Sequence, residues 1–355
     1  MPIFTSNEYN NVSNDLNFKE VIMKLGVHDL LIREAGKTNQ DVFNDTKKMV
    51  VELDKLGYDR YWFAEHHGFE NLLSVAPEIL ATYFLSNTEN IVIGTGGTMI
   101  MHYSPLKVAE TFKTMAELAP GRVDLGIGRA PGAAGHEIRA LNQNFPSKSQ
   151  NLYEEIKIIL DYLEDKEPNN PIYTKAKAMP SNNEKLVSPW MLGSTGQAMG
   201  MAAQWGLKYS HAKFFSVETP SHLFTDYKNN FIPSSFADKP YVSMSYKMLI
   251  ADDKESLEYL SKAFDYSHIQ QIRGQSSSLV NPEEVKDYEF SLNEEAILKK
   301  SYDANFIIKG TKEEVEKILD REISQYSIDE ILAFTPIYGL ENRYNTYKSL
   351  KEIFA

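Results

Sequence analysis

The chain has 355 residues, carries a net charge of −12 and contains no cysteine. This acidic balance argues against binding to nucleic acid or to an anionic membrane through overall charge. Without cysteine, disulfides, thiolate catalysis and cysteine-ligated metal sites are excluded. The composition, 42% hydrophobic and 24% charged, is typical of a globular protein with a large core.

The N-terminal residues 1–20 are polar and rich in asparagine. They lack the basic start and the apolar centre of a signal peptide. The chain also lacks the run of about 18 apolar residues that a transmembrane helix needs. We therefore expect a polar N-terminal tail at 1–20, a single domain at 21–355, and a cytoplasmic protein with no membrane partner.

Strand-like and helix-like segments alternate along the rest of the chain. The predicted strands are Ile22–His28, Tyr58–Ala64, Ile91–Gly94, Val123–Ile127, Pro189–Leu192, Leu207–Ala212, Tyr241–Ala251 and Ile331–Thr335. The predicted helices are Asp41–Lys55, Pro77–Leu85, Ser104–Leu118, Ser149–Leu163, Gln197–Gln204, Pro220–Asn230, Asp253–Phe264, Thr311–Ser324 and Glu341–Phe354.

Eight strands that alternate with helices indicate an α/β protein with a parallel sheet. This number of repeats favours a closed (β/α)8 TIM barrel, and an open doubly wound sheet is the alternative. Residues 265–305 do not continue the alternation and contain glycine, serine and glutamine. We predict that they form an irregular insertion in the barrel.

Residues 58–67, Y-D-R-Y-W-F-A-E-H-H, combine an aromatic strand with three ionisable side chains at its end. Consecutive strand residues face opposite sides, so Glu65 and His67 share one face and His66 takes the other. Barrel enzymes carry their chemistry at the C-terminal ends of strands. His66 is therefore the candidate general base, with a structural histidine as the alternative. Glu65 and His67 are expected to support it through hydrogen bonds that fix its tautomer.

Glycine-rich segments follow other predicted strands. Gly126–Gly132, G-I-G-R-A-P-G, is not a dinucleotide fingerprint, because Pro131 stands where the third glycine is required. Arg129 within it is a candidate anion clamp, since its planar guanidinium suits a phosphate. The alternative for Arg129 is an ordinary salt bridge with a carboxylate.

Two more glycine segments suggest a ligand. Gly193–Gly196 precedes a helix whose free N–H groups, with the hydroxyls of Ser194 and Thr195, would form a second phosphate contact. An ordinary helix cap is the alternative. Gly94–Gly97 is either a tight turn or a backbone that lies against a flat ligand. The ionisable residues have no spacing typical of metal ligands, so we predict no metal site.

The chain resembles the bacterial luciferase-like flavin-dependent monooxygenase family, in the branch that carries the G-R-A-P-G motif. The resemblance covers nearly the whole chain and rests on five blocks in order: 58–67, I-G-T-G-G-T-M at 93–99, S-P-L-K-V-A-E at 104–110, P-G-R-V-D-L-G-I-G-R-A-P-G at 120–132, and L-G-S-T at 192–195. It implies a (β/α)8 barrel with an insertion that binds reduced FMN at the C-terminal ends of its strands.

The resemblance also implies roles for single residues. His66 matches the catalytic base of family members. The implied cofactor-binding residues are Gly96 and Gly97 against the isoalloxazine ring, Gly128 and Arg129 at the ring edge and phosphate, and Ser194 and Thr195 on the other side of the phosphate.

The function that the resemblance implies is an FMN-dependent monooxygenase, in which reduced FMN and O2 oxygenate a small organic substrate. A separate NAD(P)H:flavin reductase and a homodimeric assembly are expected with it. Two alternatives are a deazaflavin-dependent hydride-transfer oxidoreductase of the same fold and a non-catalytic flavin-binding protein. The chain departs from its relatives at Met101-His102-Tyr103 and at Gly339-Leu340, which leaves the substrate open.

Overall fold

The computed structural model describes residues 23–143, 151–181, 187–215, 219–275 and 278–355. The polar tail predicted at 1–20 lies outside this part of the chain. Among the described helices, none has the length and hydropathy needed to cross a membrane.

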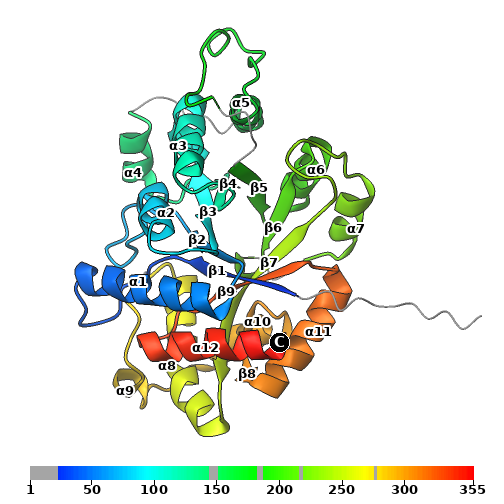
Figure 1. Cartoon of the computed structure of the whole chain (residues 1–355). Coiled ribbons are helices and arrows are strands. Elements are labelled where there is room, and N and C mark those ends of the chain that lie inside the picture. The colour runs from blue at the N-terminus through cyan, green and yellow to red at the C-terminus, as the bar shows by residue number, and fades with distance from the viewer. Residues whose placement is uncertain (1–22, 144–150, 182–186, 216–218, 276–277) are drawn as a thin grey trace, which may run out of the picture.

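Parallel strands form the centre of the molecule (Figure 1). Their bounds are β1 (Lys24–Asp29), β2 (Arg60–Phe63), β3 (Val92–Met99), β4 (Val123–Gly128), β5 (Val187–Gly193), β6 (Lys208–Ala212), β7 (Val242–Ala251), β8 (Ile307–Thr311) and β9 (Glu330–Phe334). β1 to β7 pair in chain order, and β9 pairs with both β7 and β1. These eight strands close a circle, which confirms the predicted barrel and excludes the open sheet.

The ninth strand, β8, lies outside this circle. Residues 242–245 of β7 pair with β6, and residues 243–247 pair with β9. Residues 247–251 extend past the end of β9 and pair with β8 instead. The strand β7 therefore joins the barrel to the insertion that follows it.

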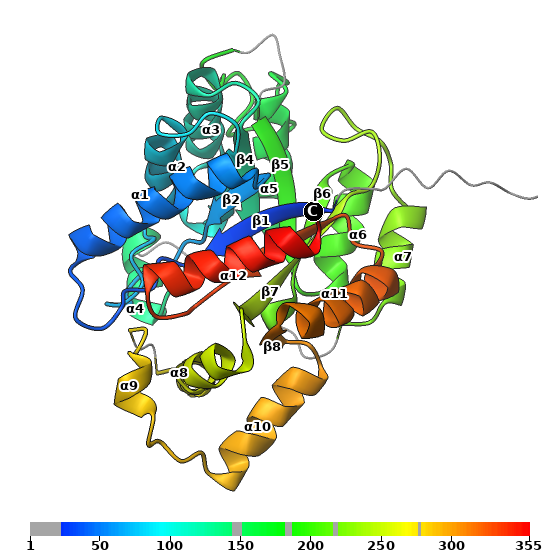
Figure 2. The same ribbon diagram turned by 60° about the horizontal axis from the view of Figure 1, so that its bottom comes forward.

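Helices cover the outside of the strands. Their bounds are α1 (Asn39–Leu56), α2 (Pro77–Leu85), α3 (Pro105–Leu118), α4 (Gly135–Leu141), α5 (Leu152–Leu163), α6 (Gly196–Trp205), α7 (His222–Asn229), α8 (Lys254–Ile272), α9 (Pro282–Val285), α10 (Leu292–Asp303), α11 (Lys312–Tyr326) and α12 (Leu340–Ile353). The helices α1 and α12 lie side by side, although they come from opposite ends of the chain (Figures 1 and 2). Figure 2 shows α8, α9 and α10 grouped together on one side of the barrel.

The insertion is more regular than the sequence analysis predicted. α8 continues to Ile272 instead of ending at Phe264, and α10 occupies much of the segment that we expected to be irregular. A local signal for α10 exists, because Ser291 and Glu294 form a capping box at its start. The short strand β8 was missed because five residues that include a lysine and a glycine show little apolar alternation.

Two further differences concern the barrel itself. The tight turn considered for Gly94–Gly97 is wrong, because β3 continues through these glycines to Met99. The short helix α4 lies in the segment after β4, where the sequence analysis placed only a loop.

A buried ion cluster occupies the N-terminal end of the barrel. The guanidinium of Arg60 donates to Glu330 at 2.6 Å and also to Asp124, and its cation lies over the rings of Trp62 and Trp190. Burial opposes the charge of Arg60, but the two carboxylates outweigh it and raise the pKa of this arginine. The cluster links β2, β4 and β9, at the end of the barrel that usually serves stability rather than catalysis.

Candidate active site

The C-terminal ends of the strands surround a first cavity with about 710 Å³ of empty space. Five of the residues predicted to bind the cofactor line it: Gly96, Gly97, Gly128, Arg129 and Ser194. They come from β3, from the end of β4, and from the segment between β5 and α6.

Glycine is required where β3 borders this cavity. A Cβ atom at Gly97 would lie 2.5 Å from the side chain of Leu192 and 2.6 Å from the carbonyl oxygen of Gly126. At Gly96 it would lie 2.9 Å from Cβ of Trp62. The peptide bond between the two glycines is cis. The bare backbone of β3 therefore forms part of the cavity wall.

Arg129 presents an incompletely satisfied guanidinium to the cavity. One terminal nitrogen donates to the hydroxyl of Tyr153, and the other donates to Oγ1 of Thr195 at 3.5 Å. Its Nε is buried and has no hydrogen-bond partner among the described residues. Within that part of the chain Arg129 also makes no salt bridge, so the alternative role considered for it is not observed there.

Thr195 is the residue before α6 and does not itself line the first cavity. Its hydroxyl makes no capping hydrogen bond to the helix and instead accepts from Arg129. The first N–H groups of α6 therefore lie beside the guanidinium, with Ser194 lining the cavity between them. A helix start next to an arginine is an arrangement that binds anions, phosphate in particular.

The sequence analysis missed His28, which lines the same cavity from β1. Neither ring nitrogen has a hydrogen-bond partner of normal geometry among the described residues. Burial lowers the pKa of His28 to about 4, and the nearby backbone of Gly96 opposes this only in part. Its position near the end of a predicted strand, the criterion applied to His66, was the signal that could have found it.

His66 faces a second cavity, which has about 860 Å³ of empty space. Burial lowers the pKa of His66 to about 4, against the attraction of Glu65, and its Nδ1 is buried without a partner among the described residues. Phe215 lines both cavities, so the two spaces are adjacent at this residue. The predicted base is therefore next to the glycine-lined cavity, not within it.

Glu65 and His67 follow the end of β2 at Phe63, and neither lines the second cavity that His66 faces. The expectation that they fix the tautomer of His66 is wrong, because they bind each other at 2.8 Å. Fully buried Glu65 also accepts from the hydroxyl of Tyr103 at 2.5 Å and from the Met99 N–H at 2.7 Å. The carboxylate thus holds the end of β2 against the end of β3, where the paired glycines are.

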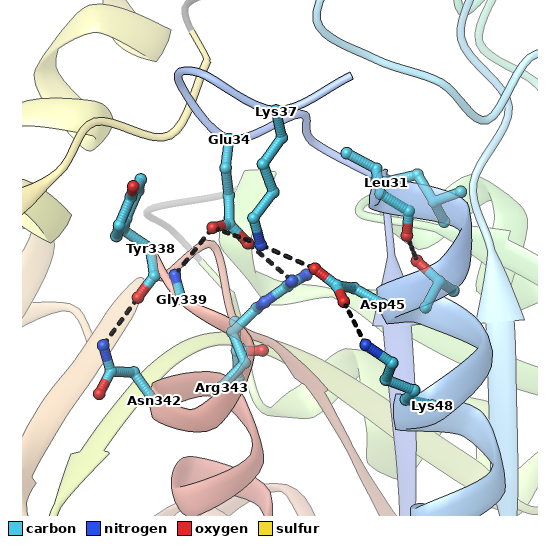
Figure 3. Close-up of polar contacts among 12 residues, drawn as sticks. Leu31, Glu34, Lys37, Asp45, Lys48, Tyr338, Gly339, Asn342 and Arg343 are labelled. Carbon is cyan, nitrogen blue, oxygen red and sulfur yellow. Dashed lines mark hydrogen bonds and ion pairs between the residues drawn. The ribbon is translucent and has the colours of Figure 1, made fainter. Parts of the chain in front are cut away.

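The wall of the second cavity is held by another buried carboxylate, Glu34 (Figure 3). Glu34 accepts from Arg343 at 2.9 Å and from the Gly339 N–H at 3.2 Å, and it pairs with Lys37 at 2.9 Å. The same loop after β1 also supplies Ile32 to the cavity lining. These contacts anchor the loop to the start of α12.

No group of three or more His, Asp or Glu side chains able to hold a metal ion occurs in the described parts of the chain. The polar groups that face the two cavities are instead the guanidinium of Arg129, the amine of Lys247, two neutral imidazoles, and several amide and hydroxyl groups. This set suits a bound anion and proton transfer.

A comparison with protein families matches residues 23–325 to the model described as luciferase-like monooxygenase. The chain belongs to this family. It is 30% identical to the uncharacterized protein YwcH of Bacillus subtilis over 94% of this chain and 100% of that protein. It is 28% identical to a luciferase-like monooxygenase of Escherichia coli K12 over 92% of this chain and 95% of that protein.

Solved structures agree with this fold. The crystal structure of apo-MsnO8 superposes with a TM-score of 0.85 at 25% identity, covering 94% of this chain and 98% of that one. The oxygenating component of 3,6-diketocamphane monooxygenase of Pseudomonas putida, solved with FMN, has a TM-score of 0.70 at 15% identity, covering 94% and 98%. An F420-dependent secondary alcohol dehydrogenase has a TM-score of 0.67 at 18% identity, covering 94% and 99%. These last two likenesses establish the barrel alone.

Proposed function

We propose that this protein is a flavin-dependent monooxygenase that binds FMN in the first cavity. The observation that carries the proposal is the guanidinium of Arg129, whose buried Nε has no partner in the described structure. It lies beside the start of α6, where free N–H groups add to its positive potential. A phosphate supplies the missing acceptor, and the bare backbone at Gly96 and Gly97 accommodates a flat ring.

Reduced FMN, when bound, supplies the electrons with which O2 is activated to oxygenate an organic substrate. The protein residues then have three tasks. Arg129 and Ser194 hold the phosphate, and the apolar side chains of Leu192 and Trp62 exclude water from the ring. The unpaired Nδ1 of His66 accepts or donates a proton in the adjacent cavity, where the substrate binds next to the cofactor.

Titration with FMN tests the anion site directly. Arg129→Ala removes a charge-assisted partner, and we expect FMN binding to weaken by about 2 kcal/mol, roughly a 30-fold increase in Kd. Arg321→Ala, which removes an exposed arginine on α11, is the matched control and should leave Kd unchanged. If both variants bind FMN as the wild-type protein does, Arg129 does not hold the phosphate.

A deazaflavin coenzyme is the second candidate, because it carries a phosphodiester that the same anion site suits and a barrel of this fold uses F420. Oxygen uptake separates the candidates. A monooxygenase with photoreduced FMN consumes O2 faster when its organic substrate is added. A hydride-transfer enzyme is identified instead by titration with both cofactors, because it binds the deazaflavin more tightly than it binds FMN. A protein that binds FMN and leaves the rate of O2 consumption unchanged with every substrate offered is a non-catalytic flavin carrier.

On the family resemblance, we further propose that a separate NAD(P)H:flavin reductase supplies the reduced FMN and that the protein acts as a homodimer. Steady NADH oxidation by the purified protein with FMN alone would contradict the first point. A monomer mass in sedimentation analysis would contradict the second.

A further inference from the structure

The strand β7 carries a cation into the second cavity. Alternate residues of a strand share one face, so Ser243, Ser245 and Lys247 point to the same side of β7. Ser245 lines the first cavity and Lys247 lines the second. Lys247 is also the residue at which β7 passes from β9 to β8. Its ammonium group is therefore built into the wall near the junction of the two cavities.

Lys247 is only 2% exposed and lacks a counter-ion among the described residues. Its Nζ has two neutral neighbours at the limit of hydrogen bonding, Nδ1 of His268 at 3.4 Å and Oε1 of Gln271 at 3.3 Å. The carboxylate of Asp265 is engaged by Lys309 at 2.6 Å. Burial lowers the pKa of Lys247 to about 7, and Asp265 opposes this only in part.

The other buried lysines of the described chain, Lys113 and Lys213, each have a carboxylate partner. Lys113, which is 1% exposed, pairs with the carboxylate of Asp165 at 2.6 Å and also donates to two carbonyl groups. Lys213, which is 3% exposed, has Glu322 at 3.4 Å. Both have an acid of the chain within salt-bridge distance. A buried ammonium without one is costly unless a ligand provides the negative charge.

The remainder of the second cavity is mainly apolar, with contributions from Leu30, Ile32, Phe69, Leu72 and Leu279. A ligand that satisfies this lining together with Lys247 has an apolar body and one acidic group. We propose that Lys247 is the specificity-determining residue of the second cavity and that the substrate is an amphipathic organic acid whose anionic group pairs with its Nζ. That this acid is oxygenated as a substrate rests on the proposed function, whereas its recognition by Lys247 does not.

A matched pair of probes tests this recognition. Octanoate and octanamide have the same alkyl chain and differ in charge, so calorimetric titration of the full chain isolates the anionic contribution. We expect the wild-type protein to bind octanoate at least tenfold more tightly than octanamide. Lys247→Met should abolish this preference and Lys247→Arg should retain it. Lys254→Met, which removes an exposed lysine from α8, is the control for net charge and should behave as wild type.

Proton uptake provides a second readout. At pH 8 most Lys247 side chains are neutral, so binding of octanoate should draw a proton onto Nζ, measurable as a dependence of the binding enthalpy on the buffer. Lys247→Arg should bind octanoate with no such uptake, because arginine stays charged. The two nearby histidines stay neutral at this pH, since burial lowers the pKa of His66 to about 4 and that of His268, with help from Lys247, to about 3. The carboxylate of Asp265 is already paired with Lys309.

The proposal is overturned if the wild-type protein binds octanoate and octanamide equally or binds neither, or if Lys247→Met keeps the preference. Titration of the same preparation with FMN separates the two proposals. FMN binding without a preference for octanoate refutes the role of Lys247 alone. A preference for octanoate that depends on Lys247, in a protein that does not bind FMN, refutes the flavin function and leaves the anion site standing.

Discussion

His66, in the segment after β2, and Lys247, on β7, line the same cavity, and the surroundings of each shift its pKa in a way that a sequence does not show. Burial lowers the pKa of both groups, so the imidazole is neutral and the ammonium is close to half-charged near neutral pH. A neutral imidazole is able to accept a proton. At the residue scale, exclusion of water from these two side chains therefore determines their protonation states.

His66→Ala tests the proton-transfer role. We expect FMN binding to remain close to wild type and turnover to fall by roughly 10²-fold or more, the usual effect of removing a general base. The measurement is substrate-dependent oxygen uptake with photoreduced FMN, with His222→Ala, an exposed histidine, as control. Unchanged turnover in the His66 variant would show that another group moves the proton.

At the scale of secondary-structure elements, the loop after β1 is held against α12. Glu34 is nearly fully buried and joins this loop to Arg343 and to the start of α12, while Lys37 extends the cluster to Asp45 on α1 (Figure 3). Backbone hydrogen bonds then tie the loop to the insertion, because the Leu279 N–H donates to the Arg33 carbonyl and the Ala35 N–H donates to the Leu279 carbonyl. The cluster therefore holds one wall of the second cavity through elements from both ends of the chain.

Arg343→Met should destabilise the protein by about 3 kcal/mol, because it leaves the buried carboxylate of Glu34 without its guanidinium partner. Urea unfolding measures this loss, and hydrogen exchange of residues 30–35 should quicken at the same time. Lys48→Met removes the exposed outer member of the same cluster and should change stability by less than about 1 kcal/mol. Equal effects of the two substitutions would mean that burial of Glu34 contributes nothing.

For the whole molecule, buried histidines predict how stability depends on pH. Burial lowers the pKa of His28 to about 4 and those of His211 and His268 to about 3, whereas an unfolded histidine titrates near 6.5. Above pH 6.5 neither state is protonated and these groups contribute nothing to the pH dependence. Below that pH the unfolded chain takes up protons that the folded protein does not, so stability falls as pH falls.

Burial also lowers the pKa of His66 to about 4, so between pH 7.5 and 5.5 the free energy of unfolding should decrease by about 5 kcal/mol for the four histidines together. Urea unfolding at both pH values measures the change. His211→Phe should reduce the decrease by about one quarter, and His136→Gln, at an exposed site, should leave it unaltered. A stability that is constant over this range would show that the four imidazoles are protonated in the folded protein.

Much of the architecture followed from local pattern. Alternation of strands and helices predicted the barrel, and the glycine segments predicted the positions of Gly96, Gly97, Gly128, Arg129 and Ser194, which line one cavity. These succeed because strand ends in a parallel barrel all face one side, so sequence position alone brings them together. The predictions failed for β8 because the strand is short, and for α10 because the capping box at its start was not recognised.

The sequence by itself determined the fold and the end of the barrel that holds the candidate site, because both depend on periodicity and on residue types within short windows. Only the tertiary structure decided that His66 faces a separate cavity and that Glu65 binds His67 and Tyr103. It also decided that Lys247 is buried with no acid of the described chain within salt-bridge distance. Each of these depends on contacts between residues far apart in the chain and on exclusion of water, and neither is encoded in any one segment.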